Sequence, residues 1–536
     1  MAIKTAVLSS ESPQHAGVLR ARDKIEQRTA KVSLVTGSSA LLAVVFQLIS
    51  VPFCLAYWGK ENYGSWLALY AAFMLVRSFD AGFATFVGNQ LNCLYHQDQD
   101  ALQEHLGSAI VGIAVIGAVQ LSLGLAATFS DGAGLLLGLS PGSSANHRSG
   151  WALLILIGTW ILSGSYLSIV HRLQIPTGLM LQAAWWAMGF QVSQFAGIML
   201  AAMLHFDLLQ TSLLFSFVQC SIYLASAVYI RRKLPAYYPW WRDGRPRTGI
   251  ANLGRSMVFT ASNLIQQGSA NGVILLISAM SGPGAVPIFT TIRTLANLWT
   301  SVTNVLTVPL LPEIVRYHAK GEGAKLVAVS EAYWILTGSA VNFGILLTYP
   351  LIYPLYEYWT AHSVVLDRPL LCLLLASVVV TNAGGLIALY LNGINRLNVV
   401  LAAAAARGFL YLPFGGLLFL RFGLSGFGMA ILGGELLALL LTGRYFLNHE
   451  LPRQGGRVPL RSIASIVASS IAVFLFLMSE GFGLPYSQRV YPICLLGVAT
   501  AALWGWKGLP PEVKNRLMNM CTPFTSEHQC ALITRQ

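Results

Sequence analysis

The chain alternates between long apolar runs and short polar breaks. A transmembrane helix needs about 20 mainly apolar residues, and fourteen runs reach roughly that length. They lie near 31–57, 62–92, 107–128, 150–170, 178–203, 209–230, 255–279, 284–311, 327–356, 367–391, 398–420, 424–446, 461–479 and 488–506. This pattern predicts an all-α polytopic membrane protein with about 14 transmembrane helices.

Composition supports the same fold class. The 536 residues are 55% hydrophobic and 10% charged, with a mean hydropathy of +0.62. Soluble domains carry about 25% charged residues, so the composition excludes an ordinary soluble protein, a disordered chain and a nucleic-acid binder. The seven cysteines follow no metal-ligand or disulfide spacing. We therefore expect no metal and no cofactor.

The basic residues are distributed unevenly over the breaks between runs. If the N-terminus is cytoplasmic, the cytoplasmic breaks hold most of the 34 Lys and Arg residues, and the net charge is +13. The opposite side holds little beyond Lys60, Arg148, Arg368, Arg421 and Arg489. Because short cytoplasmic loops are enriched in Lys and Arg, both termini are predicted to be cytoplasmic.

Three short motifs occur twice in the same order, at offsets of 224, 219 and 217 residues. They are Tyr166-Leu167 and Arg172-Leu173 with Tyr390-Leu391 and Arg396-Leu397, Gly189-Phe190 and Phe195-Ala196-Gly197 with Gly408-Phe409 and Phe414-Gly415-Gly416, and Leu234-Pro235 with Leu451-Pro452. An even number of runs separates the copies, so they share one orientation. This indicates a parallel repeat of two six-helix lobes around a central cavity, an arrangement found in one class of transporters.

The repeat also predicts the domain organisation. The parts are a cytoplasmic N-terminal segment (1–30), an N-terminal six-helix lobe (31–235), a basic cytoplasmic linker (236–254), a C-terminal six-helix lobe (255–452), two extra transmembrane helices (453–507) and a cytoplasmic tail (508–536).

Five ionisable residues stand far from the ends of their runs, namely Arg77, Asp80, Arg293, Arg407 and Glu435. A charge at the bilayer centre is costly and normally faces a cavity or a partner. Arginine side chains suit bidentate contacts with phosphate, so Arg77, Arg293 and Arg407 are predicted to bind an anionic substrate. Asp80 and Glu435 are the candidates for proton or sodium coupling.

Structural explanations of the same charges remain open. Arg77 and Asp80 are three residues apart and can neutralise each other on one helix face. Arg407 and Glu435 lie on consecutive helices and can form an ion pair. The repeat aligns Arg407 with Met188 and Glu435 with Val218, so the fold itself does not require either charge.

Amide side chains form a second candidate site. Asn263, Gln267 and Asn271 are spaced at i, i+4 and i+8 and so share one face of the seventh helix. They can line a cavity and bind sugar hydroxyls, or they can hold helices together by hydrogen bonds. Gln182, Gln191 and Gln194 in the fifth run allow the same two interpretations.

Several segments resemble polysaccharide flippases. Tyr63-Gly64-Ser65-Trp66 followed by Asp80-Ala81-Gly82-Phe83 is similar to the second-helix pattern of that family. Leu391-Asn392-Gly393-Ile394-Asn395-Arg396 resembles the segment closing its tenth helix, and Pro309 with Pro312 resembles the end of its eighth. The family is the O-antigen and exopolysaccharide flippase branch of the MOP superfamily.

The resemblance implies a substrate and a mechanism. Family members move an undecaprenyl-pyrophosphate-linked oligosaccharide from the cytoplasmic to the outer face of the inner membrane, through a cationic cavity that alternates its opening. It also implies contact with membrane lipids, and assembly proteins such as a polysaccharide polymerase as further partners. Arg293 and Arg407 match no family motif, so their assignment depends on their charge and position alone.

Three alternative functions remain. A lipid II flippase also has 14 spans and a cationic cavity. A MATE-type drug or cation antiporter needs a cavity dominated by carboxylates, and here Arg outnumber acids among the deep charges. A membrane polysaccharide polymerase or ligase needs catalytic groups on a long outer loop. The loops are short, and His362 and Asp367 form no acid/base arrangement, so we expect the chain not to be an enzyme.

Overall fold

The computed structural model describes residues 13–140, 142–307, 310–394, 396–484 and 487–509, together with 511 and 514. These residues form helices and turns, with no strand among them. Two segments predicted from the sequence lie partly outside the described residues, the N-terminal segment 1–30 and the tail 508–536, as do Pro309 and Asn395 of the family-like motifs. Residues 13–30 are helical and continue into the first apolar run.

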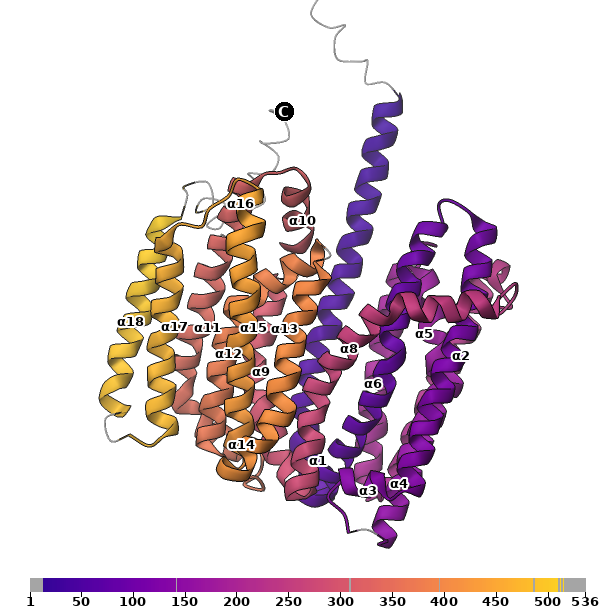
Figure 1. Cartoon of the computed structure of the whole chain (residues 1–536), viewed down its shortest axis with the longest axis horizontal. Coiled ribbons are helices and arrows are strands. Elements are labelled where there is room, and N and C mark those ends of the chain that lie inside the picture. Colours follow the sequence, from indigo (N-terminus) through magenta and orange to yellow (C-terminus); the bar gives the residue numbers. More distant parts are fainter. Residues whose placement is uncertain are drawn as a thin grey trace, which may run out of the picture. The chain divides into compact units, whose positions relative to one another are not determined.

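The helices group into two compact units that divide between Pro287 and Ile288 (Figure 1). Unit 1 contains α1 (Pro13–Leu94), α2 (Gln99–Phe129), α3 (Gly132–Leu136), α4 (Ser144–Thr159), the π-helical turn η1 (Trp160–Ser165), α5 (Tyr166–Val170), η2 (His171–Gln174), α6 (Met180–Met203), α7 (Leu208–Lys233), η3 (Pro235–Tyr237), α8 (Pro246–Ser281) and η4 (Pro283–Ala285).

Unit 2 contains the remaining helices. They are α9 (Val286–Thr307), which begins at the division, α10 (Leu311–Ala319), α11 (Gly323–Trp359), α12 (Arg368–Gly393), α13 (Leu397–Phe409), the π-helical turn η6 (Leu410–Phe414), α14 (Gly415–Phe422), α15 (Leu424–Tyr445), η7 (Phe446–Glu450), α16 (Leu451–Arg453), α17 (Leu460–Gly481) and α18 (Ser487–Gly508).

Each of the fourteen apolar runs falls on helix, with the first two runs on α1. In the described part of the chain, ten helices are long and apolar enough to cross a membrane. The predicted all-α, multi-pass membrane fold is therefore confirmed, while the count of fourteen spans stays a prediction. One of the ten covers Leu34–Leu94, which is 61 residues long and far longer than one bilayer crossing.

Local sequence explains where the helices break and begin. Gly59 adopts φ 70° and ψ 177°, a conformation open to glycine, and so divides α1 between the first two runs. Asp207 caps α7, since its side chain accepts from the Gln210 backbone N–H while the Gln210 side chain accepts from the Asp207 backbone N–H. Asp367 caps α12 by accepting from the Leu370 N–H.

Helix α8 packs within unit 1, although the repeat assigns it to the C-terminal lobe. A Cβ on Gly82 of α1 would lie 2.4 Å from the Cα of Thr260 of α8, so the two backbones touch there. The Asn263 side chain also donates to the Ser78 carbonyl oxygen of α1 at 2.8 Å. The lobe boundaries predicted from the repeat thus differ from the packing division by one helix, and they stay a prediction.

Candidate functional site

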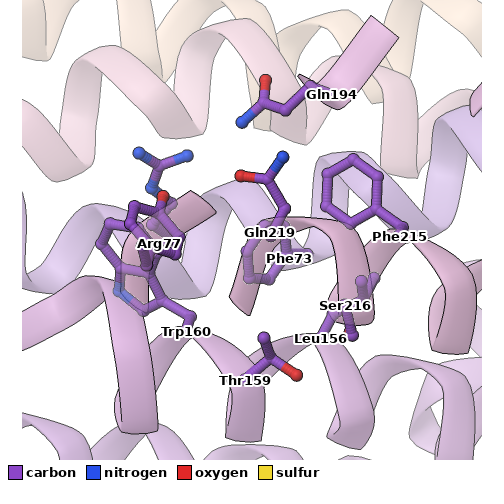
Figure 2. A pocket seen from close by; sticks show the side chains of 10 residues that line it. Phe73, Arg77, Leu156, Thr159, Trp160, Gln194, Phe215, Ser216 and Gln219 are labelled. Atoms are coloured by element: carbon purple, nitrogen blue, oxygen red, sulfur yellow. The ribbon is translucent and has the colours of Figure 1, made fainter. Parts of the chain in front are cut away.

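A small polar cavity lies inside unit 1, next to Arg77 of α1 (Figure 2). Its volume is about 20 Å³, which is room for about one water molecule. Its polar lining consists of one guanidinium, one indole, amides and hydroxyls, contributed by Arg77, Thr159, Trp160, Gln194, Ser216, Gln219 and Tyr223, and apolar side chains make up the rest. The Gln219 side-chain oxygen is buried and has no hydrogen-bond partner among the described residues. The Ser216 hydroxyl is likewise buried and has no hydrogen-bond partner among the described residues. The Arg77 guanidinium and this hydroxyl can donate hydrogen bonds to an anion, whereas the Gln219 oxygen can only accept one.

Asp80 lies one helical turn from Arg77 but does not line this cavity. Its side chain is buried, with the residue 1% exposed. One carboxylate oxygen accepts from the Trp160 indole N–H at 2.6 Å and from the Ser165 hydroxyl at 2.8 Å. Trp160 and Ser165 are the first and last residues of η1, so the π-helical turn presents both donors to the same oxygen. Such turns are frequent at functional sites.

Trp160 separates the two charges that the sequence suggested could pair directly. The Arg77 guanidinium carbon lies 4.0 Å from the centroid of the Trp160 ring, in a cation–π contact. Asp80 is held by the N–H of the same indole. Within the described residues the two charges are thus joined through Trp160 and form no direct ion pair. Trp160 and Ser165 are the residues that sequence reasoning missed.

In the amide stripe of α8, Asn263 contacts a neighbouring helix, whereas Asn271 and Gln267 bond each other within α8. Asn263 donates to the backbone of α1, and the Asn271 side chain donates to the Gln267 side-chain oxygen at 2.9 Å. Gln191 of α6 likewise accepts from Ser39 of α1 at 2.8 Å. Only Gln194, from the other amide group, lines the Arg77 cavity. The proposed sugar contacts of Asn263, Gln267 and Asn271 stay a prediction.

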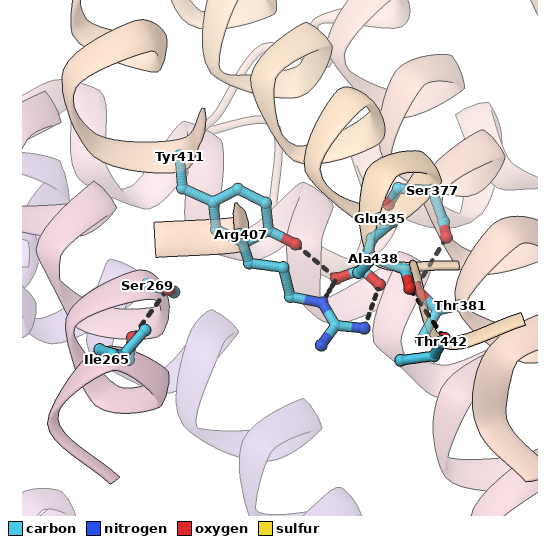
Figure 3. A network of polar contacts seen from close by, with 9 residues as sticks. All are labelled: Ile265, Ser269, Ser377, Thr381, Arg407, Tyr411, Glu435, Ala438 and Thr442. Carbon is cyan, nitrogen blue, oxygen red and sulfur yellow. Dashed lines mark hydrogen bonds and ion pairs between the residues drawn. The ribbon is translucent and has the colours of Figure 1, made fainter. Parts of the chain in front are cut away.

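Arg407 and Glu435 form a bidentate ion pair in unit 2 (Figure 3). Arg407 Nε lies 2.9 Å from Glu435 Oε1, and Nη2 lies 3.0 Å from Oε2. The Tyr411 hydroxyl donates to the same Oε1 atom. Tyr411 lies on η6, so a π-helical turn again places a donor against a membrane carboxylate. The structure thus shows the paired alternative, and the predicted roles of Arg407 in substrate binding and of Glu435 in ion coupling stay predictions.

Arg293 is half-buried on α9 of unit 2. Its guanidinium carbon lies 5.9 Å from the centroid of the Phe289 ring, one turn earlier on the same helix. The side chain therefore sits beside an aromatic face, as Arg77 does in unit 1. Its predicted role as a headgroup cation stays a prediction.

Known proteins were compared by sequence and by structure. The sequence matches no protein-family model and no curated protein. Among solved structures, "Lipid II flippase MurJ, inward closed conformation" has a TM-score of 0.61 at 14% identity, and the match covers 88% of this chain and 98% of that one. An inward-facing multidrug resistance MATE family transporter of the MOP superfamily has a TM-score of 0.61 at 14% identity, covering 79% and 99%. A point mutant of the Vibrio cholerae MATE transporter VcmN has a TM-score of 0.54 at 16% identity, covering 80% and 98%.

The chain has the MOP transporter fold. At these identities the similarity establishes the architecture alone. The MOP fold agrees with the two units, the apolar helices and the superfamily that the short motifs resemble. The polysaccharide-flippase branch within that superfamily stays a prediction.

Proposed function

We propose that the chain is a flippase for an undecaprenyl-pyrophosphate-linked oligosaccharide, the repeat unit of an O-antigen or exopolysaccharide. It moves this lipid across the inner membrane by alternating access, with the sugar-pyrophosphate headgroup inside the protein and the lipid tail in the bilayer. One observation carries the proposal. The cavity of unit 1 is lined by the Arg77 guanidinium together with hydroxyls and amides, while the neighbouring carboxylate of Asp80 is already occupied by Trp160 and Ser165.

The balance of charge favours an anionic cargo over a drug cation. Asp80 accepts two short hydrogen bonds, and Glu435 is held by Arg407 and Tyr411. Both deep carboxylates are therefore engaged, and a cation would have to displace these partners. A guanidinium offers parallel donors that match phosphate oxygens. The 20 Å³ cavity is too small for a pyrophosphate, so the proposal requires the helices to part, as alternating access does.

A lipid II flippase is the second candidate. One structural neighbour bears that name, and lipid II is also an anionic, lipid-linked saccharide. The segments Tyr63-Gly64-Ser65-Trp66 and Asp80-Ala81-Gly82-Phe83 favour the oligosaccharide branch, because they are similar to its second-helix pattern.

Binding of undecaprenyl pyrophosphate to the full chain in nanodiscs tests the proposal, measured by native mass spectrometry. Arg77→Gln removes the charge and keeps most of the length, so we expect affinity to fall about tenfold or more, since hydrogen bonds to charged groups contribute about 1.5–3 kcal/mol. Arg77→Lys should retain most of the affinity. Arg148→Gln is the control, because Arg148 is 64% exposed and pairs with Asp207 at the surface.

Two results would contradict this assignment. Undiminished binding by Arg77→Gln removes the guanidinium from the site. Wild-type protein that binds ethidium but not undecaprenyl pyrophosphate is a cation transporter. Stronger binding of lipid II than of undecaprenyl pyrophosphate bearing other saccharides supports the second candidate.

A further inference from the structure

A second, larger polar cavity lies wholly within unit 2, between α9, α11 and α12. Its volume is about 200 Å³, roughly ten times that of the Arg77 cavity. Hydroxyls and amides reach it from its walls, chiefly those of Thr300, Thr303, Asn304, Thr381, Asn382 and Asn392, beside apolar side chains such as Val378 and Leu389. None of the described residues that line it is charged. We call it the threonine–asparagine chamber.

The walls of the chamber are arranged to leave hydrogen-bonding capacity unused. The Thr303 and Thr381 hydroxyls donate to carbonyl oxygens of their own helices, each at 2.8 Å, so each oxygen can still accept. Asn304 and Asn392 are exposed, which places two amides at the edge of the chamber. A ligand with several hydroxyl groups can therefore both donate to these walls and accept from them.

One aromatic side chain, Tyr333, lies at the chamber because a glycine on the facing helix leaves room for it. The Tyr333 hydroxyl of α11 donates to the Asn382 carbonyl oxygen of α12 at 3.2 Å. A Cβ on Gly385 would lie 2.7 Å from that hydroxyl oxygen, so only glycine lets the tyrosine approach. Behind it, Trp334, Leu386 and Phe446 belong to one buried hydrophobic cluster. The chamber is thus a formed feature of well-packed helices.

The internal repeat provides a comparison within the same chain. At the offset of 224 that aligns Tyr390 with Tyr166, Thr381 corresponds to Ile157 and Gly385 to Ile161. In unit 1 these isoleucines fill the space beside glycines of α2, 3.0 Å from the Cβ position of Gly124 and 3.1 Å from that of Gly117. The corresponding helix surface carries isoleucine side chains in unit 1 and borders a cavity with polar side chains in unit 2. The fold therefore does not require the chamber. Binding of a polar ligand would explain why polar side chains line it.

We infer that the threonine–asparagine chamber binds a sugar ring of the transported headgroup, an inference that depends on the proposed function. Uncharged polar walls can hydrogen-bond sugar hydroxyls. A phosphate would need a cationic side chain, such as the Arg77 guanidinium of the other cavity. A bare sodium ion needs a tight shell of oxygens, not an open space of this size. The chamber lies near the C-terminal ends of α9 and α12, which the predicted orientation places on the cytoplasmic side, where this cargo is taken up.

Paired lipids test the inference on the full-length protein in nanodiscs. The probes are bare undecaprenyl pyrophosphate and the same lipid bearing glucose, galactose, N-acetylglucosamine or N-acetylgalactosamine. We expect wild-type protein to bind at least one glycosylated lipid more tightly than the bare lipid. Thr381→Val and Asn304→Ala should each weaken that glycosylated lipid about five- to tenfold, the scale of one or two lost hydrogen bonds, and leave the bare lipid unchanged. Thr442→Val is the matched control, since the Thr442 hydroxyl also donates to a carbonyl oxygen of its own helix but Thr442 does not line the chamber.

Other outcomes would overturn either the sugar site alone or the proposed function together with it. Equal binding of bare and glycosylated lipids by the wild type, or equal weakening of both by the variants, overturns the sugar site while the proposed function stands. Variants that change only the response to sodium also overturn it. Failure of the wild type to bind any of these lipids refutes the proposed function, and the sugar site with it. Asn304 is exposed, so its substitution keeps the test valid if Thr381→Val fails to fold.

Discussion

Three of the deep membrane charges are compensated by neighbours within their own unit. Asp80 has two donors from η1, and Arg407 and Glu435 hold each other with Tyr411 alongside. Burying an ion is costly unless it is paired and hydrogen-bonded. These contacts explain how such residues persist in apolar helices.

Removing one partner of the Arg407–Glu435 pair should expose that cost. Glu435→Gln leaves the guanidinium without its carboxylate, and a broken buried pair costs about 3–5 kcal/mol. Since the Arg407 side chain is 32% exposed, we expect about 1–3 kcal/mol, measured by thermal unfolding in detergent. The double variant Arg407→Met with Glu435→Met should recover most of the loss. Arg148→Met, which breaks a surface pair, should change stability by less than about 1 kcal/mol. Equal effects of Glu435→Gln and Arg148→Met would show that the membrane pair is not stabilising.

The sequence predicted which charges lie inside the apolar runs, but only part of their surroundings. Arg407 and Glu435 are on consecutive helices, so their pairing was one of two open interpretations. The partners of Asp80 lie 80 and 85 residues away in the chain. They also depend on a π-helical turn, which shifts the register of side chains and has no signal in apolar periodicity. Polar residues clustered in an apolar run, as Trp160 and Ser163 to Ser165 are, offered the only hint.

At the scale of helices, the length of the apolar runs determines where helices form. A small residue, Gly82, allows the close packing of α1 against α8. Over the residues that the structure describes, the fourteen apolar runs are mainly helical, because a long apolar segment satisfies its backbone in a bilayer by forming a helix. The position of α8 depends instead on close contact at Gly82, which is part of the motif that resembles polysaccharide flippases. Periodicity alone could not reveal that contact.

Gly82→Ala should separate α1 from α8. Its Cβ would lie 2.4 Å from the Cα of Thr260, and such overpacking costs about 1–3 kcal/mol. We expect a lower unfolding temperature in detergent. Gly268→Ala is the matched control on α8, since a Cβ there meets nothing within 4 Å, and it should not lower the unfolding temperature. Equal stability of the two variants would show that the helices do not depend on this approach.

At the scale of the whole molecule, the two units differ in the chemistry of their cavities. Unit 1 has a small cavity beside a guanidinium, and unit 2 has a larger neutral polar chamber. A cargo with an anionic and a saccharide part would match both kinds of wall. The similarity to the solved MurJ and MATE structures extends over 79–88% of the chain and concerns the fold.

Flipping of a lipid-linked oligosaccharide by the purified full chain tests the central claim most directly. Undecaprenyl-pyrophosphate-linked oligosaccharide is distributed over both leaflets of proteoliposomes, and an impermeant glycosidase is added outside. We predict that vesicles with the wild-type chain lose inner-leaflet glycan as well as outer-leaflet glycan, whereas protein-free vesicles lose the outer pool alone. Wild-type vesicles that retain their inner pool as protein-free vesicles do would contradict the account.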